Sequence, residues 1–324
     1  MNRIGWLCFY LLLCTAVFFS CNEPHANHNG TASSSREISE TKIWSVPDLA
    51  STPNNKEGEL IKYGRDLVIR TSLYLGPDGI ISHTSNGMNC QNCHLDAGTK
   101  IFGNNFSAVA STYPKFRARR GSLETVEQRI NDCIERSLNG TVLDTNSREM
   151  RAMVAYVKWV GKDVPKDSVP FGSGIFNVPL LERAADAAKG KIVFMQKCVA
   201  CHANDGQGKK DSTKKYFLYP PLWGKNSFNS TAGLFRLSRI SGFVKANMPL
   251  GTTYQTPLLT DEEAWDVAAY ICMQHRPEKK FTCDWPDVSK KPFDFPFAPY
   301  ADSFSAIQHK FGPWQAIILT QKRK

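Results

Sequence analysis

Cysteine and histidine recur in two pentapeptides of this sequence with identical spacing. Each pentapeptide reads CxxCH, formed by Cys90, Cys93 and His94 in the first copy and by Cys198, Cys201 and His202 in the second. This pattern is typical of c-type haem attachment, in which two thiols add to the porphyrin vinyl groups and the adjacent imidazole ligates the iron. A lone CxxC pair is also compatible with a redox dithiol or half a zinc site. Two complete copies favour two covalently bound haems, named here haem 1 and haem 2.

The segments after the two motifs repeat, and the repeat predicts the second axial ligand of each iron. The tripeptides at 155–157 and 269–271 read Ala-Tyr-Val and Ala-Tyr-Ile, and they mark equivalent positions near the end of each unit. In the second unit Met248 lies 22 residues before position 270, and the proline after it imposes an extended backbone. In the first unit Cys133 lies 23 residues before position 156. We therefore expect His94 and Cys133 at haem 1, and His202 and Met248 at haem 2.

Both distal assignments have an alternative. A free cysteine such as Cys133 is most often a small buried core side chain, and Lys245 is a second candidate ligand of haem 2. If Cys133 does ligate, its thiolate lowers the potential of haem 1, whereas methionine raises that of haem 2. Electrons would then run from haem 1 to haem 2. A pure electron carrier does not need a thiolate ligand, so we expect substrate chemistry at haem 1.

A basic run lies between the first motif and Cys133. It contains Lys115, Arg117, Arg119 and Arg120. Guanidinium groups bind oxyanions in a fixed fork geometry, although such a run is also compatible with a solvated face or with pairing to haem propionates. We expect at least one of these residues to bind an anionic substrate, and we select Arg117 and Arg119 together with Cys133 as the catalytic set.

Helical periodicity predicts the elements that position these residues. Apolar residues recur at helical spacing in residues 60–73 and 187–198. In the second segment they are Ala188, Ile192 and Met195. A helix from about 122 to 140 places Cys133 on one face, together with Val126 and Ile130.

A closing helix is expected at the end of each unit. In the second unit Thr260 and Glu263 form a capping box, and in the first unit Ser147 is the expected cap. The first closing helix should bury Met150, Met153, Val154, Val157 and Val160. These elements predict a mostly α protein with two tandem class I cytochrome c-like helical domains and an irregular C-terminal extension.

The expected domain boundaries follow from these elements and from the N-terminus. An apolar run at 4–19 is too short for a comfortable membrane span and ends at Ser20-Cys21, which resembles a lipoprotein cleavage site. We expect lipid on Cys21, with a plain signal peptide as the alternative, and a location on the periplasmic side of a bacterial membrane. The expected parts are a signal peptide at 1–20, a flexible tether at 21–56, cytochrome c domains at 57–165 and 166–275, and a C-terminal extension at 276–324 that packs on the body.

Composition limits the classes of partner. The chain has 324 residues, 42% hydrophobic content and a formal charge of +10, as expected for a soluble globular protein of about two domains. A basic surface without nucleic-acid motifs favours an anionic substrate and an acidic redox carrier as electron partner, and it argues against nucleic acid. Of the cysteines outside the signal, the motifs and Cys21, we expect Cys272 and Cys283 to form a disulfide, as an oxidising compartment allows, and Cys133 to stay unpaired.

Four segments resemble the dihaem thiosulfate dehydrogenase / tetrathionate reductase family. They are residues 87–94, 113–120, 126–140 and 308–314, and the resemblance covers about residues 57–315. It implies His94/Cys133 ligation at an active-site haem and His202/Met248 ligation at an electron-exit haem, although some members ligate the second haem through lysine. It also implies oxidation of two thiosulfates to tetrathionate, or the reverse reaction. The expected disulfide is not part of the family pattern.

The residues themselves agree with that reaction. Converging arginines would lower the cost of bringing two dianions together, and a transient bond from the Cys133 sulfur would divide the coupling into two steps. Two other classes remain open at this point: a dihaem cytochrome that only shuttles electrons, and an enzyme that acts on another sulfur anion.

Overall fold

The computed structural model describes residues 44–213 and 215–323, all of which belong to one compact unit. The predicted signal peptide at 1–20, the Cys21 lipid anchor and most of the predicted tether lie outside the described residues. Within the described part of the chain, no helix has the length and apolar character needed to cross a membrane.

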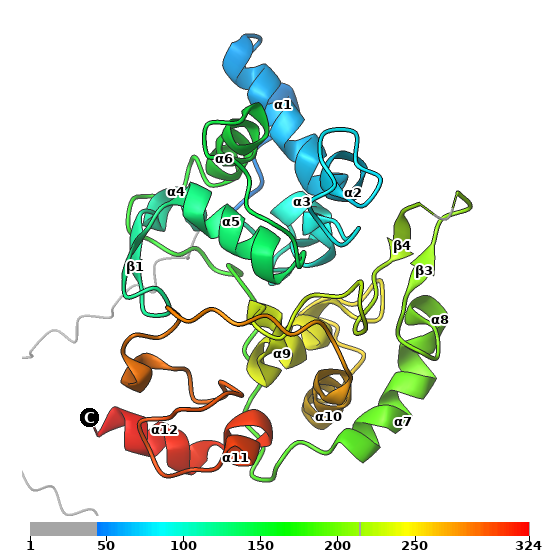
Figure 1. Cartoon of the computed structure of the whole chain (residues 1–324), viewed down its shortest axis with the longest axis vertical. Coiled ribbons are helices and arrows are strands. Elements are labelled where there is room, and N and C mark those ends of the chain that lie inside the picture. Colours follow the sequence, from blue (N-terminus) through cyan, green and yellow to red (C-terminus); the bar gives the residue numbers. More distant parts are fainter. Residues whose placement is uncertain (1–43, 214, 324) are drawn as a thin grey trace, which may run out of the picture. The chain divides into compact units, whose positions relative to one another are not determined.

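The described chain is mostly helical, with two short antiparallel hairpins (Figure 1). The first group of elements comprises η1 (Leu49–Ser51), α1 (Lys56–Ile69), α2 (Thr71–Leu75), η2 (Cys90–Asn92), α3 (Leu95–Gly98), α4 (Val109–Thr112), β1 (Lys115–Arg117), β2 (Ser122–Glu124), α5 (Val126–Arg136) and α6 (Arg148–Val160). The second comprises α7 (Ala187–Lys197), α8 (Val199–His202), β3 (Lys209–Lys210), β4 (Phe217–Tyr219), η3 (Gly233–Phe235), α9 (Leu237–Asn247) and α10 (Asp261–Met273). The C-terminal extension contains η4 (Val288–Lys290), α11 (Ala306–Phe311) and α12 (Gln315–Lys322).

Each group packs its first long helix against its last one through a glycine. A Cβ at Gly64 of α1 would lie 1.9 Å from the Ala152 carbonyl oxygen of α6, and a Cβ at Gly190 of α7 would lie 1.8 Å from the Asp266 carbonyl oxygen of α10. Only glycine allows backbones to approach this closely. The α1–α6 and α7–α10 pairs therefore form the frame of each group (Figure 1).

The closing helices agree with the sequence analysis. The Ser147 hydroxyl accepts a hydrogen bond from the Met150 amide at the start of α6, and Thr260 and Glu263 form a capping box at the start of α10. The predicted apolar residues of α6 are all buried. The mostly α fold class is confirmed.

The helix expected at 187–198 is present as α7, but the bounds expected for the helix that carries Cys133 are wrong in detail. In α7 the buried residues are Gly190, Val193 and Phe194, because the close approach at Gly190 turns that face toward α10, and Ile192 and Met195 are exposed. The helix that carries Cys133 begins at Val126 rather than near Ser122, which pairs with Arg117 in the β1–β2 hairpin. It ends at Arg136 rather than near Gly140.

The packed chain begins within the predicted tether. Trp44 is buried, and its indole Nε1 donates a hydrogen bond to the Val160 carbonyl oxygen at 3.3 Å. Packing on α6 therefore starts earlier along the chain than the expected boundary at residue 57.

The expected disulfide between Cys272 and Cys283 is wrong. Cys272 is buried in α10, and its thiol donates a hydrogen bond to the Phe235 carbonyl oxygen at 3.4 Å. Cys283 is an exposed free thiol. The chain between them leaves α10 and runs to α5, where Asp284 contacts Arg136, so the neighbouring contacts hold the two thiols in different environments.

Thiol reactivity checks this correction. At pH 8, iodoacetamide should modify Cys283 rapidly in the native protein, and Cys272 only after unfolding, because burial raises the pKa of the Cys272 thiol to about 11. Peptide mass spectrometry identifies the two sites, and Cys283→Ser serves as the control that should lose only the rapid site. If both cysteines stayed unmodified after unfolding without a reductant, the disulfide would exist after all.

Candidate active site

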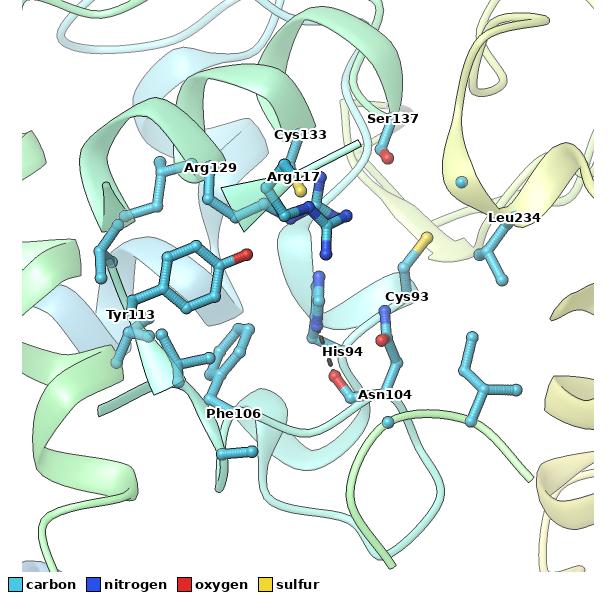
Figure 2. Close-up of a pocket in the computed structure, with 18 of the residues that line it drawn as sticks. Cys93, His94, Asn104, Phe106, Tyr113, Arg117, Arg129, Cys133, Ser137 and Leu234 are labelled. Atoms are coloured by element: carbon cyan, nitrogen blue, oxygen red, sulfur yellow. Dashed lines mark hydrogen bonds between the residues drawn. The ribbon is translucent and has the colours of Figure 1, made fainter. Parts of the chain in front are cut away.

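A cavity of about 670 Å³ brings most of the predicted site residues together (Figure 2). Its volume lies in the range of about 300–1,000 Å³ that is usual for cofactor and small-molecule sites. Its walls come from the first helical group, from α9 and from the extension. They include Cys90, Cys93, His94, Cys133, Arg117, Arg119, Arg129, Arg236, Arg239 and Trp285.

The imidazole of His94 is held in one orientation. Its Nδ1 forms a hydrogen bond with the Asn104 carbonyl oxygen at 2.5 Å, and its ring packs on Phe106 (Figure 2). The carbonyl can only accept, so Nδ1 carries the proton and Nε2 is left for an iron ion. Burial lowers the pKa of His94 to about 4, so the ring stays neutral as ligation requires.

The same arrangement occurs in the second helical group. The His202 Nδ1 bonds the Pro220 carbonyl oxygen at 2.9 Å, and burial lowers the pKa of this ring as well. Cys198 and Met248 both pack against the core of this group. Both motif histidines therefore present Nε2, although the surrounding loops differ in sequence.

The donor set fits haem better than zinc. Among residues 44–213 and 215–323, no three or more histidine, cysteine and acidic side chains are grouped to hold a metal ion. A porphyrin supplies the equatorial nitrogens itself, so an iron needs only axial ligands from the protein. The first pair of thiols lies at the cavity wall, Cys93 buried and Cys90 half-buried, and desolvation raises the pKa of Cys90 to about 11 and that of Cys93 to about 12. These residues suit a covalently held haem.

Cys133 lies on the cavity side of α5, one helical turn after Arg129 (Figure 2). The nearby sulfur of Cys133 is the main reason that the pKa of Arg129 is raised above its ordinary value. The Arg129 guanidinium has no ion-pair partner among the described residues, and Figure 2 shows this side chain pointing into the same space as His94.

Sequence reasoning missed Arg129. The signal was present, because residues four apart on a helix share a face, and Arg129 precedes Cys133 by four. The denser basic run at 115–120 lies before this helix, whereas Arg129 is a single basic residue within it.

The two arginines selected from the sequence are both in the cavity wall but are tied to carboxylates. The Arg117 Nε lies 3.4 Å from the Glu124 carboxylate across the β1–β2 hairpin. The Arg119 Nη1 donates to the Thr231 carbonyl oxygen at 3.0 Å, and its Nε lies 3.9 Å from Asp284. Burial lowers the pKa of Arg119 to about 10. Arg117 keeps more freedom to turn toward a substrate than Arg119 does.

The second helical group contributes two further arginines that the sequence did not reveal. Arg236 is paired with the buried Asp294, with its Nε at 2.7 Å from Oδ1. The guanidinium of Arg239, in the first turn of α9, has no hydrogen bond or ion pair with the described residues. Burial and then the charge of Arg236 lower the pKa of Arg239. Only the tertiary fold brings α9 to this cavity.

Lys245 is occupied away from the second haem site. Its Nζ donates to the Leu259 carbonyl oxygen at 2.7 Å and pairs with the Asp261 carboxylate at 2.7 Å. Met248, the C-terminal cap of α9, has no such polar anchor and lies against the core with Cys198. This arrangement favours the thioether over the lysine amine.

Comparison with known proteins agrees with two cytochrome domains. The family model described as SoxA/TsdA, cytochrome c domain matches residues 82–165, and the cytochrome c model matches residues 187–273. The two tandem domains and two covalently bound c-type haems are thus confirmed. Neither match includes the C-terminal extension.

Relatives with similar sequences share one name. A thiosulfate dehydrogenase from Allochromatium vinosum is 40% identical over 241 residues, which cover 73% of this chain and 86% of the relative. A thiosulfate dehydrogenase from Psychrobacter arcticus is 36% identical and covers 82% of this chain and 79% of the relative.

A solved structure is similar over most of the chain. It is the thiosulfate dehydrogenase TsdBA from Marichromatium purpuratum, with a TM-score of 0.69 and 29% identity. The similarity covers 80% of this chain and 54% of the solved chain, so this protein spans about half the length of that structure. Taken with the curated relatives, this similarity shows that the chain is an oxidoreductase that belongs to the thiosulfate dehydrogenase family of dihaem c-type cytochromes.

Proposed function

We propose that this protein couples two thiosulfate dianions into tetrathionate, or catalyses the reverse reaction, in the cavity that contains Cys133. The observation that carries the proposal is the shared cavity itself, in which a free thiol, a CxxCH motif and several guanidinium groups meet. An electron shuttle has no need of such an arginine-lined cavity. The names of the relatives support the choice of thiosulfate over another sulfur anion.

The proposed ligand sets follow from the residues that face each site. His94 and Cys133 would hold the iron of haem 1, and His202 and Met248 would hold that of haem 2. When bound, the two haems each accept one electron, with the thiolate-ligated site at the lower potential. The oriented Nε2 atoms of the two histidines and the anchored Lys245 support these assignments.

Electrostatics supports a cavity for two dianions. Two S₂O₃²⁻ ions become S₄O₆²⁻ and two electrons, so four negative charges have to gather before the sulfur–sulfur bond forms. Arg129 and Arg239 both line the cavity, and their guanidinium groups lack ion-pair partners among the described residues. Pre-placed cations in a water-poor site stabilise such charge without reorganisation during the reaction.

Cys133 would act on sulfur in two steps. In the first, the thiolate sulfur bonds the outer sulfur of one thiosulfate, giving Cys–S–S–SO₃⁻ and releasing two electrons. In the second, the outer sulfur of another thiosulfate attacks the outer sulfur of this adduct. Tetrathionate leaves, and the Cys133 thiolate is restored.

We also propose the periplasmic side of a bacterial membrane as the location, with lipid on Cys21 and a small acidic redox carrier that takes electrons from haem 2. The sequence at 4–21 and the charge of +10 support these proposals. The carrier and the direction of catalysis are separate from the sulfur chemistry described above.

Replacement of the thiol tests the proposed function. Cys133→Ala should retain both haems, because neither attachment motif is touched, and should lose tetrathionate formation by about two orders of magnitude or more. Turnover is measured with thiosulfate and ferricyanide. The matched control is Cys272→Ala, which removes another free thiol outside this cavity and should keep near-wild-type turnover. Near-wild-type activity in Cys133→Ala would leave the shuttle as the better description.

Replacement of the unpaired guanidinium groups tests anion binding. Arg129→Gln and Arg239→Gln should each lower kcat/KM for thiosulfate by about 10- to 100-fold, since a charge-assisted hydrogen bond is worth about 1.5–3 kcal/mol. Arg148→Gln is the control, because Arg148 lies on the exposed face of α6 over the Tyr63 ring. Steady-state kinetics that show equal effects for all three variants would contradict a specific anion site.

A further inference from the structure

A short part of the C-terminal extension, residues 279–286, runs along the helix that carries Cys133. We name it the strap. In Figure 1 this orange segment passes from α10 to the β1–β2 hairpin. The Lys279 Nζ donates to the Gly140 carbonyl oxygen at 3.0 Å, just beyond the end of α5. The Trp285 amide donates to the Arg119 carbonyl oxygen at 2.7 Å, in the hairpin turn before α5. The strap thus holds the chain on both sides of α5.

The strap also packs closely on the hairpin turn. Gly121 has a positive φ of 70°, and a Cβ there would lie 2.5 Å from the Pro286 ring. The guanidinium of Arg119 lies over the Trp285 ring at 5.4 Å. The position of Arg119 in the cavity wall therefore depends on the strap.

The strongest contact is an ion pair in the last turn of α5. Arg136 donates two hydrogen bonds to the Asp284 carboxylate, both at 2.8 Å, and its guanidinium lies 3.7 Å from the centre of the Phe281 ring. The Arg136 side chain is only 6% exposed. A buried guanidinium without its carboxylate is strongly unfavourable, so Arg136 requires Asp284 to stay where it is.

Ion pairs as well as apolar packing hold α5 in place. Its buried residues are Val126, Asp132, Ile134 and Arg136, and two of these four carry charge. Asp132 contacts Arg120 at 3.2 Å and Arg136 at 3.9 Å. Cys133 lies between the two charged residues in sequence, so a shift of either ion pair moves the thiol.

We propose that Asp284 is a positioning residue for the reactive thiol, acting through Arg136 and Arg119. The proposal rests on the proposed function at Cys133. The strap sets the distance between Cys133 and the opposite wall of the cavity, where His94 presents Nε2. Misplacement of a reacting group by about 1 Å costs on the order of a hundredfold in rate. The C-terminal extension is in this sense part of the active site, although it follows both cytochrome domains in sequence.

The second helical group provides a matched control. Arg183 donates two hydrogen bonds to the Asp266 carboxylate, both at 2.8 Å, and Asp266 is buried in α10. This pair has the geometry of the Arg136–Asp284 pair, and neither residue lines the cavity. Its loss should affect stability without reaching Cys133.

The experiment compares Asp284→Asn with Asp266→Asn in the full-length dihaem protein. The readouts are kcat and KM for thiosulfate, the melting temperature, and the electron paramagnetic resonance spectrum of the ferric protein, which reports the axial ligands of each haem. In Asp284→Asn we expect kcat to fall by about tenfold or more, KM to change less than kcat, and the haem 1 signal to shift or split. In Asp266→Asn the haem 1 signal and kcat should match the wild type even if the melting temperature falls.

Other results would overturn the proposal. A wild-type haem 1 signal and kcat in Asp284→Asn would show that the ion pair is only structural, as would equal effects in both variants. If Asp284→Asn does not accumulate with two haems, Phe281→Leu is the second variant, because it removes the ring that packs on Arg136 and keeps the ion pair. An unchanged haem 1 signal and kcat in Phe281→Leu would also overturn the proposal. Cys133→Ala distinguishes failure of the proposed function from failure of the proposal about Asp284. If that variant keeps full turnover, the proposed function fails, whatever Asp284→Asn does to the haem 1 signal.

Discussion

The structure as a whole depends on the neutralisation of the guanidinium groups that gather in the cavity. Each buried cation loses hydration and repels its neighbours, and the loss has to be offset by carboxylates or by a bound anion. Glu124, Asp284 and Asp294 each neutralise one arginine of the cavity wall. Arg129 and Arg239 have no such carboxylate contact among the described residues. The cavity thus keeps an excess of positive charge, and this excess is what an anionic substrate or a haem propionate can neutralise.

The two helical groups solve the haem-binding problem in the same way and differ where chemistry requires it. Both pack their first and last long helices through a glycine, at Gly64 and Gly190, and both fix the motif histidine through a backbone carbonyl. The differences lie in the opposite wall. The first group has a thiol on a charged helix there, and the second has Met248 against an apolar core. One group is therefore suited to bind and react with anions, and the other to carry electrons.

The C-terminal extension links these differences. It supplies the carboxylates that neutralise Arg136 in the thiol helix and Arg236 in α9, so it contacts both helical groups on the side of the cavity. Its Trp314 is fully buried against Trp265 of α10, which anchors the far end of the extension in the second core. A cytochrome domain alone would expose these arginines to water, and a buried cationic cavity would not form.

Several features followed from the amino-acid sequence alone because they are local. The CxxCH motifs, the capping boxes and the apolar stripe of α6 depend on residues within one or two turns of each other, and the family resemblance rests on short segments. They were enough to predict two c-type haems and a mostly α fold, whereas the reactive role of Cys133 stays a prediction. The ligand sets themselves, including Met248, stay predictions.

Tertiary structure decided the features that depend on residues distant in sequence. The approach of α9 brings Arg239 to a cavity of the first group, and the pairing of Arg136 with Asp284 joins positions 148 residues apart. The spacing of residues in the sequence cannot reveal such pairs. A charged residue gives the same sequence pattern whether its side chain is solvated or buried against a distant partner. The disulfide expectation failed for the same reason: the short separation between Cys272 and Cys283 suggested a bond, but burial of one thiol in α10 and the contacts of the strap around the other decided their environments.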